Sequence, residues 1–383
     1  MSRVKFGDVV KDVKINIDRL NNPYEYYVAG DHMDSEDLTI HRKGCFTTDD
    51  VGPAFIRVFK PGQILYGSRR TYLKKIAVAD FEGVCANTTF VFETKDPRAF
   101  EQRLLPFIML SKDFTTWSIA KSKGSTNPYV LFSDLADFEF ELPPLEEQKV
   151  LADKLWAAYR LKEAYKKLLV ATDEMVKSQF IEMFGNPLSL NQKNELKRLG
   201  ECCILNPRRP NIALCDTDKV SFIPMPAVSE DGYLVDMTDE EYGKVKKGFT
   251  YFENNDVLFA KITPCMENGK GAIVHGLTNG IGMGSTEFHV LRPINGISSP
   301  YWLLTLTRMP IFRERAAKNM SGTGGQKRVS ASYLNHFMVG LPAIEEQRRF
   351  EAIYRQADKS KSVIQKALVY LNDIQSDELG KIA

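Results

Sequence analysis

The sequence lacks the features that would place it in a membrane or in a disulfide-rich extracellular protein. No apolar run in its 383 residues approaches the roughly 20 residues needed to span a bilayer. Residues 1–10 have no apolar core of the signal-peptide kind. The six cysteines are scattered without a Cys-x-x-Cys pair, which favours free thiols in a reducing compartment over disulfides or a zinc site. These absences predict a cytoplasmic protein with no membrane partner.

The motifs of common catalytic centres are also missing. There is no phosphate-binding P-loop, and the glycine-rich residues 280–284 lead into a strand and are interpreted as a turn. The sequence Asn127-Pro128-Tyr129 lacks the second proline of an adenine methyltransferase box, and its counterpart in the second half, 326–328, is unrelated. The five histidines have no metal-ligand spacing, and a net charge of +2 neither demands nor excludes nucleic acid. We therefore predict no catalytic and no metal-binding residues in this chain.

What the sequence does contain is a long internal repeat. LPPLEEQ at residues 142–148 returns as LPAIEEQ at 341–347, a shift of 199 residues. The same shift pairs Val130 with Val329 and Leu135 with Leu334, whereas further upstream the shift drifts by a few residues. A period near 200 is far too long for a solenoid and indicates two copies of one domain, a pseudo-two-fold internal repeat.

Each LPxxEEQ segment is predicted to open a long helix, because proline suits the first helical position and the paired glutamates complement the helix dipole. Apolar residues then recur at spacings of three and four in both copies, as in a coiled-coil seam. We predict that helices 143–185 and 342–383 pair as an antiparallel coiled coil, a rod of about 60 Å; the alternative is that each packs only on its own domain. The predicted pairing residues are Leu151, Ala158, Leu161, Tyr165, Leu168 and Met175 in the first helix, and Phe350, Ile353, Ala357, Ile364, Leu371 and Ile374 in the second.

The remaining segments, 1–142 and 186–341, have a mixed composition. Short β-branched and aromatic runs such as 54–59 and 88–92 are separated by Gly, Pro and Asn turns. Helical patterns are confined to the neighbourhoods of residues 97–120 and 300–318. Each segment is predicted to be an α+β domain with a twisted antiparallel sheet.

Basic and polar loops recur at matching places in the two domains. Residues 66–75 and 121–127 in the first correspond to 261–270 and 318–328 in the second. Arg, Lys, Asn and Gln are the side chains that pair with base edges and phosphates. Any one of these runs alone is more typical of a solvated loop, but their recurrence favours nucleic-acid binding. The candidate DNA-contacting residues are Arg69, Arg70, Lys74, Lys75, Lys123, Asn127, Lys261, Asn268, Lys270, Asn319, Gln326, Lys327 and Arg328.

These motifs resemble the specificity subunit of type I restriction–modification enzymes. The resemblance rests on DVLFAKITP at 256–264, ENGK at 267–270, GTGGQKRVS at 322–330 and the repeated LPxxEEQ with its helix. It covers essentially the whole chain. The first half departs from the commoner forms at residues 67–70 and 125–129.

The resemblance implies that each globular half is a target-recognition domain that reads one half of a split double-stranded DNA sequence, while the helices fix the unread spacer. It implies no catalysis by this chain. The partners would be two methyltransferase subunits, which methylate adenine N6, and two motor–nuclease subunits. S-adenosylmethionine, ATP and Mg²⁺ would then belong to those partners and not to this chain.

Three alternatives remain open at this point. The same architecture could serve a methylation-only or type II-like complex, the chain could be an autonomous enzyme, or it could be a coiled-coil scaffold that binds proteins and no DNA. If the resemblance holds, the unequal basic loops predict a bipartite target that is not a palindrome.

Overall fold

The computed structural model describes residues 2–185, 194–323 and 325–382, and these residues form two compact units. Unit 1 consists of residues 1–167 and 365–383, and unit 2 of residues 168–364. Each unit therefore contains one of the globular segments expected from the sequence together with part of each long helix. No helix of the described residues combines the length and the apolarity needed to cross a bilayer.

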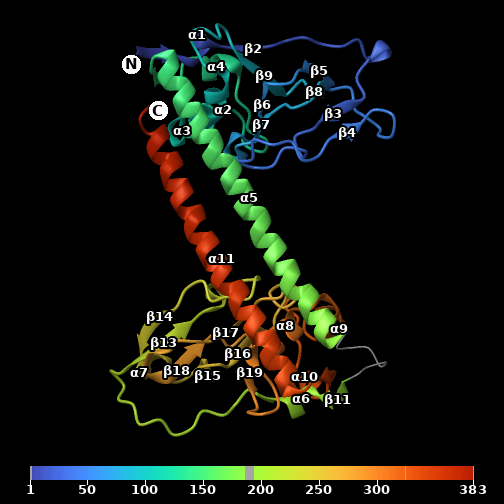
Figure 1. Cartoon of the computed structure of the whole chain (residues 1–383), viewed down its shortest axis with the longest axis vertical. Helices are drawn as coiled ribbons and strands as arrows, with labels where there is room; N and C mark the ends of the chain where they lie inside the picture. Colours follow the sequence, from blue (N-terminus) through green and yellow to red (C-terminus); the bar gives the residue numbers. More distant parts are fainter. Residues whose placement is uncertain (1, 186–193, 324, 383) are drawn as a thin grey trace. The chain divides into compact units, whose positions relative to one another are not determined.

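Unit 1 contains three sheets and four short α-helices (Figure 1). One sheet has the order β2-β9-β6-β7, the second β4-β3-β8-β5, and the third pairs β1 with β10. The strands are β1 (Ser2–Lys5), β2 (Val10–Asp12), β3 (Tyr26–Val28), β4 (Gly44–Cys45), β5 (Phe55–Phe59), β6 (Ile64–Gly67), β7 (Ile76–Val78), β8 (Gly83–Ala86), β9 (Thr89–Thr94) and β10 (Glu139–Leu142). The helices are α1 (Phe6–Val9), α2 (Leu105–Leu110), α3 (Lys112–Ala120) and α4 (Phe132–Ala136), with 3-10 turns η1 (Arg19–Asn21), η2 (Thr71–Leu73) and η3 (Gln102–Leu104).

Unit 2 repeats this topology strand for strand. Its sheets have the orders β12-β19-β16-β17 and β14-β13-β18-β15, with β11 paired to β20. The strands are β11 (Glu195–Arg198), β12 (Cys203–Leu205), β13 (Lys219–Ile223), β14 (Thr238–Glu241), β15 (Thr250–Glu253), β16 (Val257–Ala260), β17 (Gly271–Ile273), β18 (Ile281–Gly284), β19 (Phe288–Pro293) and β20 (Met338–Leu341). The helices are α6 (Leu199–Cys202), α7 (Tyr242–Val245), α8 (Pro300–Arg308), α9 (Pro310–Lys318) and α10 (Ala331–Asn335), with 3-10 turns η4 (Met225–Ala227) and η5 (Thr278–Gly280).

The prediction of purely antiparallel sheets is wrong at one place in each unit. Strand β3 pairs with β8 in parallel, Tyr27 opposite Val84, and β13 pairs with β18 in parallel, Phe222 opposite Met283. A parallel pair needs a long crossover connection. In unit 1 this connection is the segment 29–82, which itself contains β4 to β7, so the pairing could not be inferred from any local pattern.

Aromatic side chains fill the core of unit 1 between the β2-β9-β6-β7 sheet and helices α2 and α3. Phe6 lies with its ring centroid 5.6 Å from that of Phe92 and 5.2 Å from that of Phe114. All three side chains are completely buried. Burial of one such side chain contributes about 1.5–3 kcal/mol, so this cluster holds α1 and α3, which carry Phe6 and Phe114, against strand β9.

Two long helices follow the domains, α5 (Leu145–Phe184) and α11 (Ile344–Leu379). In unit 1 the core includes Leu151 and Leu155 of α5 together with Leu379 of α11 and Ile382 beyond it. The backbone N–H of Glu141 on β10 also donates to the carbonyl of Ile382, at 2.9 Å. The last residues of the chain therefore complete the unit that the first residues begin.

In unit 2 the other ends of the same helices enter the core. The ring of Phe350 near the start of α11 lies 5.2 Å from that of Phe180 and 5.6 Å from that of Phe184, both near the end of α5. All three belong to the cluster around the buried Trp302 of α8. Helix α8 and the two long helices thus share one core.

A buried glutamine explains the repeated LPxxEEQ motif. The side-chain amide of Gln148 donates to the carbonyls of Ala99 (3.0 Å) and Pro143 (2.7 Å), and its oxygen accepts from the N–H of Glu101 (2.9 Å). The equivalent Gln347 makes three bonds of the same kind, to Ile297, Pro342 and Ser299. Because both amides are 0–1% exposed, each fixes the start of a long helix to the loop that precedes the α2 or α8 segment of its own domain.

Candidate nucleic-acid interface

In unit 1 the structure brings two basic loops together, residues 67–75 and 121–129, which we call loop pair 1. The N–H of Arg70 donates to the carbonyl of Pro128 (2.7 Å), and that of Val130 to the carbonyl of Ser68 (2.9 Å). Lys123 and Tyr129 exchange two backbone hydrogen bonds of 2.8 and 2.9 Å. Segments more than 50 residues apart in the sequence therefore form one surface.

The candidate residues of loop pair 1 differ in whether their polar side chains already bond to other parts of the protein. Arg69, Arg70 and Asn127 are exposed. Lys74 forms an ion pair of 2.5 Å with Glu36, and Lys75 donates to the carbonyl of Gly30. Lys123 pairs with Asp134 at 2.9 Å. Among these candidates, the two arginines and the asparagine thus face solvent and take part in none of these ion pairs or hydrogen bonds.

In unit 2 residues 261–270 and 319–328 form the corresponding surface, loop pair 2. The N–H of Thr263 donates to the carbonyl of Lys327 (3.0 Å), and that of Val329 to the carbonyl of Lys261 (3.0 Å). Ser321 and Arg328 exchange two backbone hydrogen bonds of 3.0 and 2.8 Å. Lys261, Gln326, Lys327 and Arg328 are thereby brought together, as in unit 1.

Two of the predicted asparagines are engaged elsewhere. Asn268 donates to the carboxylate of Glu230 (2.8 Å) and lines a cavity of about 650 Å³ within unit 2. Asn319 at the end of α9 donates to the carbonyl of Arg315 (2.9 Å) and to the hydroxyl of Tyr333 (3.1 Å). Lys270 is partly exposed and directly precedes β17. These three residues lie on the same pair of loops as Arg328, and their contact with DNA stays a prediction.

Loop pair 2 contains a charged residue that the sequence analysis missed, Glu287. Both of its carboxylate oxygens accept from Arg328, at 2.9 Å from Nε and 2.8 Å from Nη2. The hydrogen bonds from Arg328 hold the pKa of Glu287 below its ordinary value of 4.5. A comparison with Thr88, the residue 199 positions earlier, could have signalled it, since an acid replaces a hydroxyl directly before an equivalent strand.

The floor of loop pair 2 is a buried histidine. His289 Nε2 lies 2.9 Å from the carbonyl of Val329, and burial lowers the pKa of the ring. The ring is therefore neutral near pH 7 and donates from Nε2. His289 supports the loop from below and does not face solvent.

The two loop pairs share one backbone pattern with different side chains. The N–H of Ser68 donates to the carbonyl of Thr88 (3.2 Å), as that of Lys261 donates to the carbonyl of Glu287 (2.9 Å). The carbonyls of Ser68 and Lys261 then accept from Val130 and Val329. At the three equivalent positions, unit 1 has Ser68, Thr88 and Tyr129, and unit 2 has Lys261, Glu287 and Arg328.

One trio of possible metal ligands occurs among the described residues: Asp37, His41 and Glu163, whose ligand atoms lie within 4.8 Å of one another. Hydrogen bonds account for this arrangement. His41 Nε2 is 2.9 Å from one oxygen of Asp37, and the hydroxyl of Tyr159 on α5 donates to the other at 2.5 Å. The trio attaches the segment 37–41 to α5.

The fold and the loop pairs define a class of protein: a duplicated α+β binding protein, each half of which carries a surface of basic and amide side chains built from two loops. The chain belongs to the family of the type I restriction modification DNA specificity domain. The family's model matches it twice, at residues 19–169 and 191–368.

Individual relatives agree with this assignment. The chain is 43% identical over 136 residues to the type I restriction enzyme EcoAI specificity subunit of Escherichia coli, a match that covers 35% of this chain and 23% of that protein. It is 37% identical over 166 residues to the EcoEI specificity subunit of the same species, which covers 43% and 27% respectively. The matches thus span about a quarter of the length of these relatives.

Solved structures show a similar fold. The S subunit of a type I restriction–modification system from M. genitalium has a TM-score of 0.60 at 15% identity, and the match covers 99% of this chain and 94% of that one. A chain from a structure describing complex assembly and conformational transition of the type I restriction–modification system has a TM-score of 0.54 at 19% identity, with 99% and 96% covered. The likeness extends over both units.

Proposed function

We propose that this chain is the DNA-recognition subunit of a type I restriction–modification system and that each unit reads one half of a bipartite, asymmetric target. The observation that carries the proposal is the pair of equivalent loop surfaces with one backbone pattern and two sets of side chains. A duplicated scaffold with different groups at the same positions is what the reading of two different half-sites requires.

The chemistry of the exposed groups supports DNA as the ligand. Arg69 and Arg70 in unit 1, and Gln326 and Lys327 in unit 2, are exposed. Arginine and glutamine can bind base edges through two hydrogen bonds, whereas lysine is suited to phosphates. In this proposal the arginines, Asn127 and Gln326 read bases, and the lysines hold the DNA backbone.

We infer further that α5 and α11 pair as an antiparallel coiled coil that sets the unread spacer. Lys154 near the start of α5 lies 3.8 Å from Glu378 near the end of α11, within unit 1. Lys361 of α11 pairs with Asp173 of α5 within unit 2. Phe350 near the start of α11 also contacts Phe180 and Phe184 near the end of α5, and this order, early with late and late with early, is what antiparallel pairing requires.

The residues predicted to pair the two helices differ in how deeply they are buried. Phe350, Ala357, Ile364 and Leu371 of α11 and Leu151 of α5 are buried, and Ala158, Tyr165, Ile353 and Ile374 are half-buried. Leu161, Leu168 and Met175 of α5 are 43%, 48% and 42% exposed. The buried α5 residues beyond Leu151 include Leu155, Tyr159, Val176 and Phe180, about one position away from the predicted seam. The pairing role of the individual residues therefore stays a prediction.

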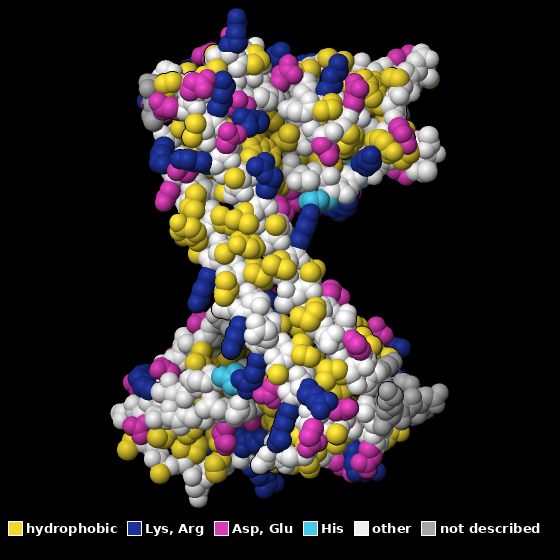
Figure 2. Space-filling model, viewed as in Figure 1, with side chains coloured by type: hydrophobic (Ala, Val, Ile, Leu, Met, Phe, Trp, Pro, Cys, Tyr) yellow, Lys and Arg dark blue, Asp and Glu magenta, His cyan; other side chains and the backbone are white. Residues whose placement is uncertain are grey.

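The long helices also offer surfaces for the proposed methyltransferase subunits. Hydrophobic side chains gather over the helices in the space-filling view (Figure 2). Val150, Val170, Val363, Val369 and Tyr370 are each 55–68% exposed. Apolar surface of this extent is typical of protein–protein interfaces.

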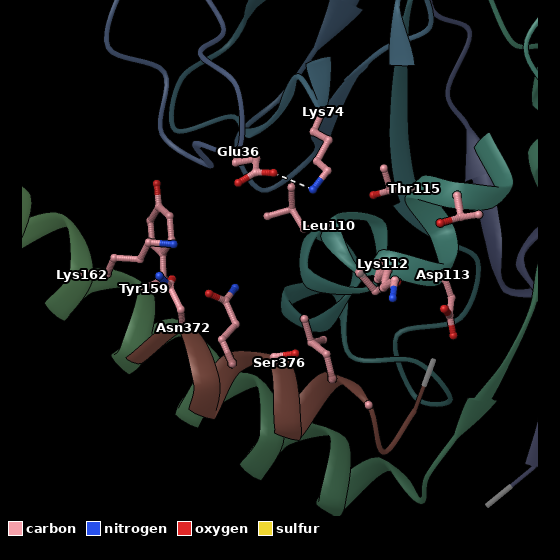
Figure 3. Close-up of a pocket in the computed structure, with 15 residues that line it drawn as sticks. Glu36, Lys74, Leu110, Lys112, Asp113, Thr115, Tyr159, Lys162, Asn372 and Ser376 are labelled. Atoms are coloured by element: carbon pink, nitrogen blue, oxygen red, sulfur yellow. Dashed lines mark hydrogen bonds and ion pairs between the residues drawn. The ribbon is translucent and has the colours of Figure 1, made fainter. Parts of the chain in front are cut away.

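A cavity of about 490 Å³ in unit 1 lies beside these helices. Tyr159 and Lys162 of α5 and Asn372 of α11 line it, with the Glu36–Lys74 ion pair opposite (Figure 3). We propose that two methyltransferase subunits dock on these faces. S-adenosylmethionine, ATP and Mg²⁺ then belong to the methyltransferase and to two motor–nuclease subunits, and the complex works on DNA in the cytoplasm.

The experiment that tests the proposal is co-expression of the chain with its cognate methyltransferase subunit, followed by sequencing of methylated positions in the host DNA. A single bipartite and asymmetric methylated motif is the expected result. A palindromic motif, or the absence of any methylation by an assembled complex, would contradict it.

A further inference from the structure

The guanidinium group of Arg328 is held by two groups, the carboxylate of Glu287 and the backbone carbonyl of Gln326. Nε donates to the Glu287 carboxylate, with Oε2 at 2.9 Å and Oε1 at 3.1 Å, and Nη2 donates to Oε1 at 2.8 Å. Nη1 donates to the carbonyl of Gln326 at 3.3 Å. The side chain is nevertheless 40% exposed, so part of its donor set faces solvent.

A count of donors identifies that part. A guanidinium has five N–H groups, one on Nε and two on each Nη. Glu287 takes the N–H of Nε and one of Nη2, and Gln326 takes one of Nη1. One N–H on each Nη is thus left without a partner among the described residues, and these two donors are available to a ligand. Two parallel donors at this spacing fit the O6 and N7 acceptors that guanine presents in the major groove.

The backbone of Arg328 is fixed as well. Its N–H and carbonyl both bond to Ser321, and the neighbouring Lys327 and Val329 are bonded to Thr263 and Lys261. Glu287 is fixed through its carbonyl, which accepts from the N–H of Lys261 at 2.9 Å. A donor pair ordered before binding loses little conformational entropy when it meets its ligand, so Arg328 is suited to discriminate between bases.

We propose that Arg328 reads a guanine in the half-site of unit 2, and that Glu287 is the positioning residue that turns the end of the guanidinium toward the base. This inference rests on the proposed function. Unit 1 has Tyr129 and Thr88 at these positions and so reads its half-site with other groups.

The first part of the test uses the unaltered chain in its methyltransferase complex. Once its methylated motif is known, 7-deazaguanine replaces each guanine of the target in turn, which removes only the N7 acceptor. At one guanine of one half-site the substitution should lower DNA affinity about tenfold, within the range expected for one bidentate base contact. If the half-site of unit 2 contains no guanine, or if no 7-deazaguanine lowers affinity, the inference is overturned.

The second part combines that base with variants. Arg328→Ala should abolish the effect of 7-deazaguanine and relax the base preference at that position, while the other half-site keeps its preference. Arg328→Lys should not rescue the preference because an ammonium group cannot form the two parallel bonds. Glu287→Gln should relax the same position partially. Equal loss at all positions, or an unchanged preference in Arg328→Ala, would count against the reading role.

The adjacent Lys327 provides the matched control. Lys327→Ala should weaken binding to all sequences alike and leave the base preference intact. The outcomes also separate the two proposals: the unaltered complex would show no bipartite motif if the proposed function failed, whereas a bipartite motif insensitive to Arg328 would overturn only the present inference.

Discussion

Loop pair 1 and loop pair 2 share one pattern of backbone hydrogen bonds but differ in the side chains at three equivalent positions. Unit 1 presents hydroxyl groups and a tyrosine at the positions where unit 2 presents Lys261, Glu287 and Arg328. Since the loops are joined through main-chain N–H and carbonyl groups, their side chains can change without altering the scaffold. The difference teaches that shape is maintained by the backbone here and recognition is left to the side chains.

The junction between domain and helix behaves in the opposite way. Gln148 and Gln347 are the same residue, equally buried, with the same kinds of partner. A buried amide needs all of its partners, because an unsatisfied one costs about 1–3 kcal/mol. This position has little freedom to vary, which accounts for the repeat being clearest there.

The largest effect is expected from a pair of equivalent core positions. Phe350→Ala should destabilise unit 2 by about 3–5 kcal/mol, because a fully buried ring that contacts Phe180 and Phe184 is removed. Leu151→Ala at the equivalent position in unit 1 should cost less, about 2–3 kcal/mol. Hydrogen exchange resolved along the chain measures both. Each variant should lose protection mainly in its own unit, and equal losses in both units would show that they do not behave separately.

Substitution of two loop glycines, one in each unit, should also destabilise unit 2 more than unit 1. Gly322 has φ of +137°, and a Cβ there would lie 2.4 Å from the carbonyl oxygen of Gln326. Gly124 in loop pair 1 has φ of +88° with nothing within 4 Å of such a Cβ. Gly322→Ala should therefore add a steric clash to about 1–3 kcal/mol of backbone strain, whereas Gly124→Ala should cost about 1–2 kcal/mol.

Thermal unfolding and DNA affinity of the two glycine variants give the measurement. Gly322→Ala should be the more damaging to both. Equal losses of stability and affinity in the two variants would contradict the steric difference between the two glycine positions.

The charges of the two loop pairs predict a smaller, graded effect. Loss of Lys327, assigned to a phosphate, should reduce the slope of log affinity against log salt by about one, whereas loss of both Arg69 and Arg70, assigned to base edges, should mainly relax the base preference of unit 1 and change the slope less. Arg98, whose side chain is 91% exposed in unit 1, offers a control that should leave the slope unchanged. A slope that falls equally in all three variants would remove the argument for these loops as the contact surface.

The smallest effect is a difference in pH dependence. The pKa of Glu287 lies below its ordinary 4.5 because of Arg328, so the pair stabilises loop pair 2 above that value and the stabilisation is lost as pH falls through the lowered pKa. Thr88, the equivalent residue beside loop pair 1, does not titrate; the Lys123–Asp134 pair of loop pair 1 gives a background of the same sign, because hydrogen bonds from Lys123 and the N–H of Leu131 outweigh burial and lower the pKa of Asp134. Relative to the intrinsic exchange rate at each pH, amide exchange of residues 321–329 should therefore accelerate more than that of 123–130 between about pH 6 and about pH 3.5.

Glu287→Gln separates this effect from the titration of other carboxylates. The excess acceleration in loop pair 2 should disappear in that variant. If it persists, the pH dependence comes from a group other than Glu287.

The sequence predicted the features that depend on local pattern or on comparison of the two copies. The α+β duplication follows from the 199-residue shift, and the helix starts follow from proline and paired glutamates. The sequence showed that residues 66–75 and 121–127 have counterparts in the second domain, but not that these two loops lie together. The hydrogen bond between Arg70 and Pro128 joins segments that share no local sequence signal. The role of Gln148 was missed for the same reason.

The burial of individual side chains was harder to predict. Seam positions such as Leu161 were chosen by period alone, but α5 packs on the core of unit 1 near its start and on that of unit 2 near its end. Its buried face is therefore set by two domains as well as by α11. The partners of Asn268 and Asn319, Glu230 and Tyr333, could not be found from the sequence, since they are known only from the fold.

The position of Leu379 and Ile382 in the core of unit 1 has a consequence for biosynthesis. All of unit 2 lies between residues 168 and 364, so every residue it needs is synthesised before the end of α11. Unit 1, although its strands emerge first, waits for residues synthesised after the whole of unit 2. Unit 1 is thus the unit whose core depends on Leu379 and Ile382, and a chain that stops short of these residues would carry one finished unit and one left open.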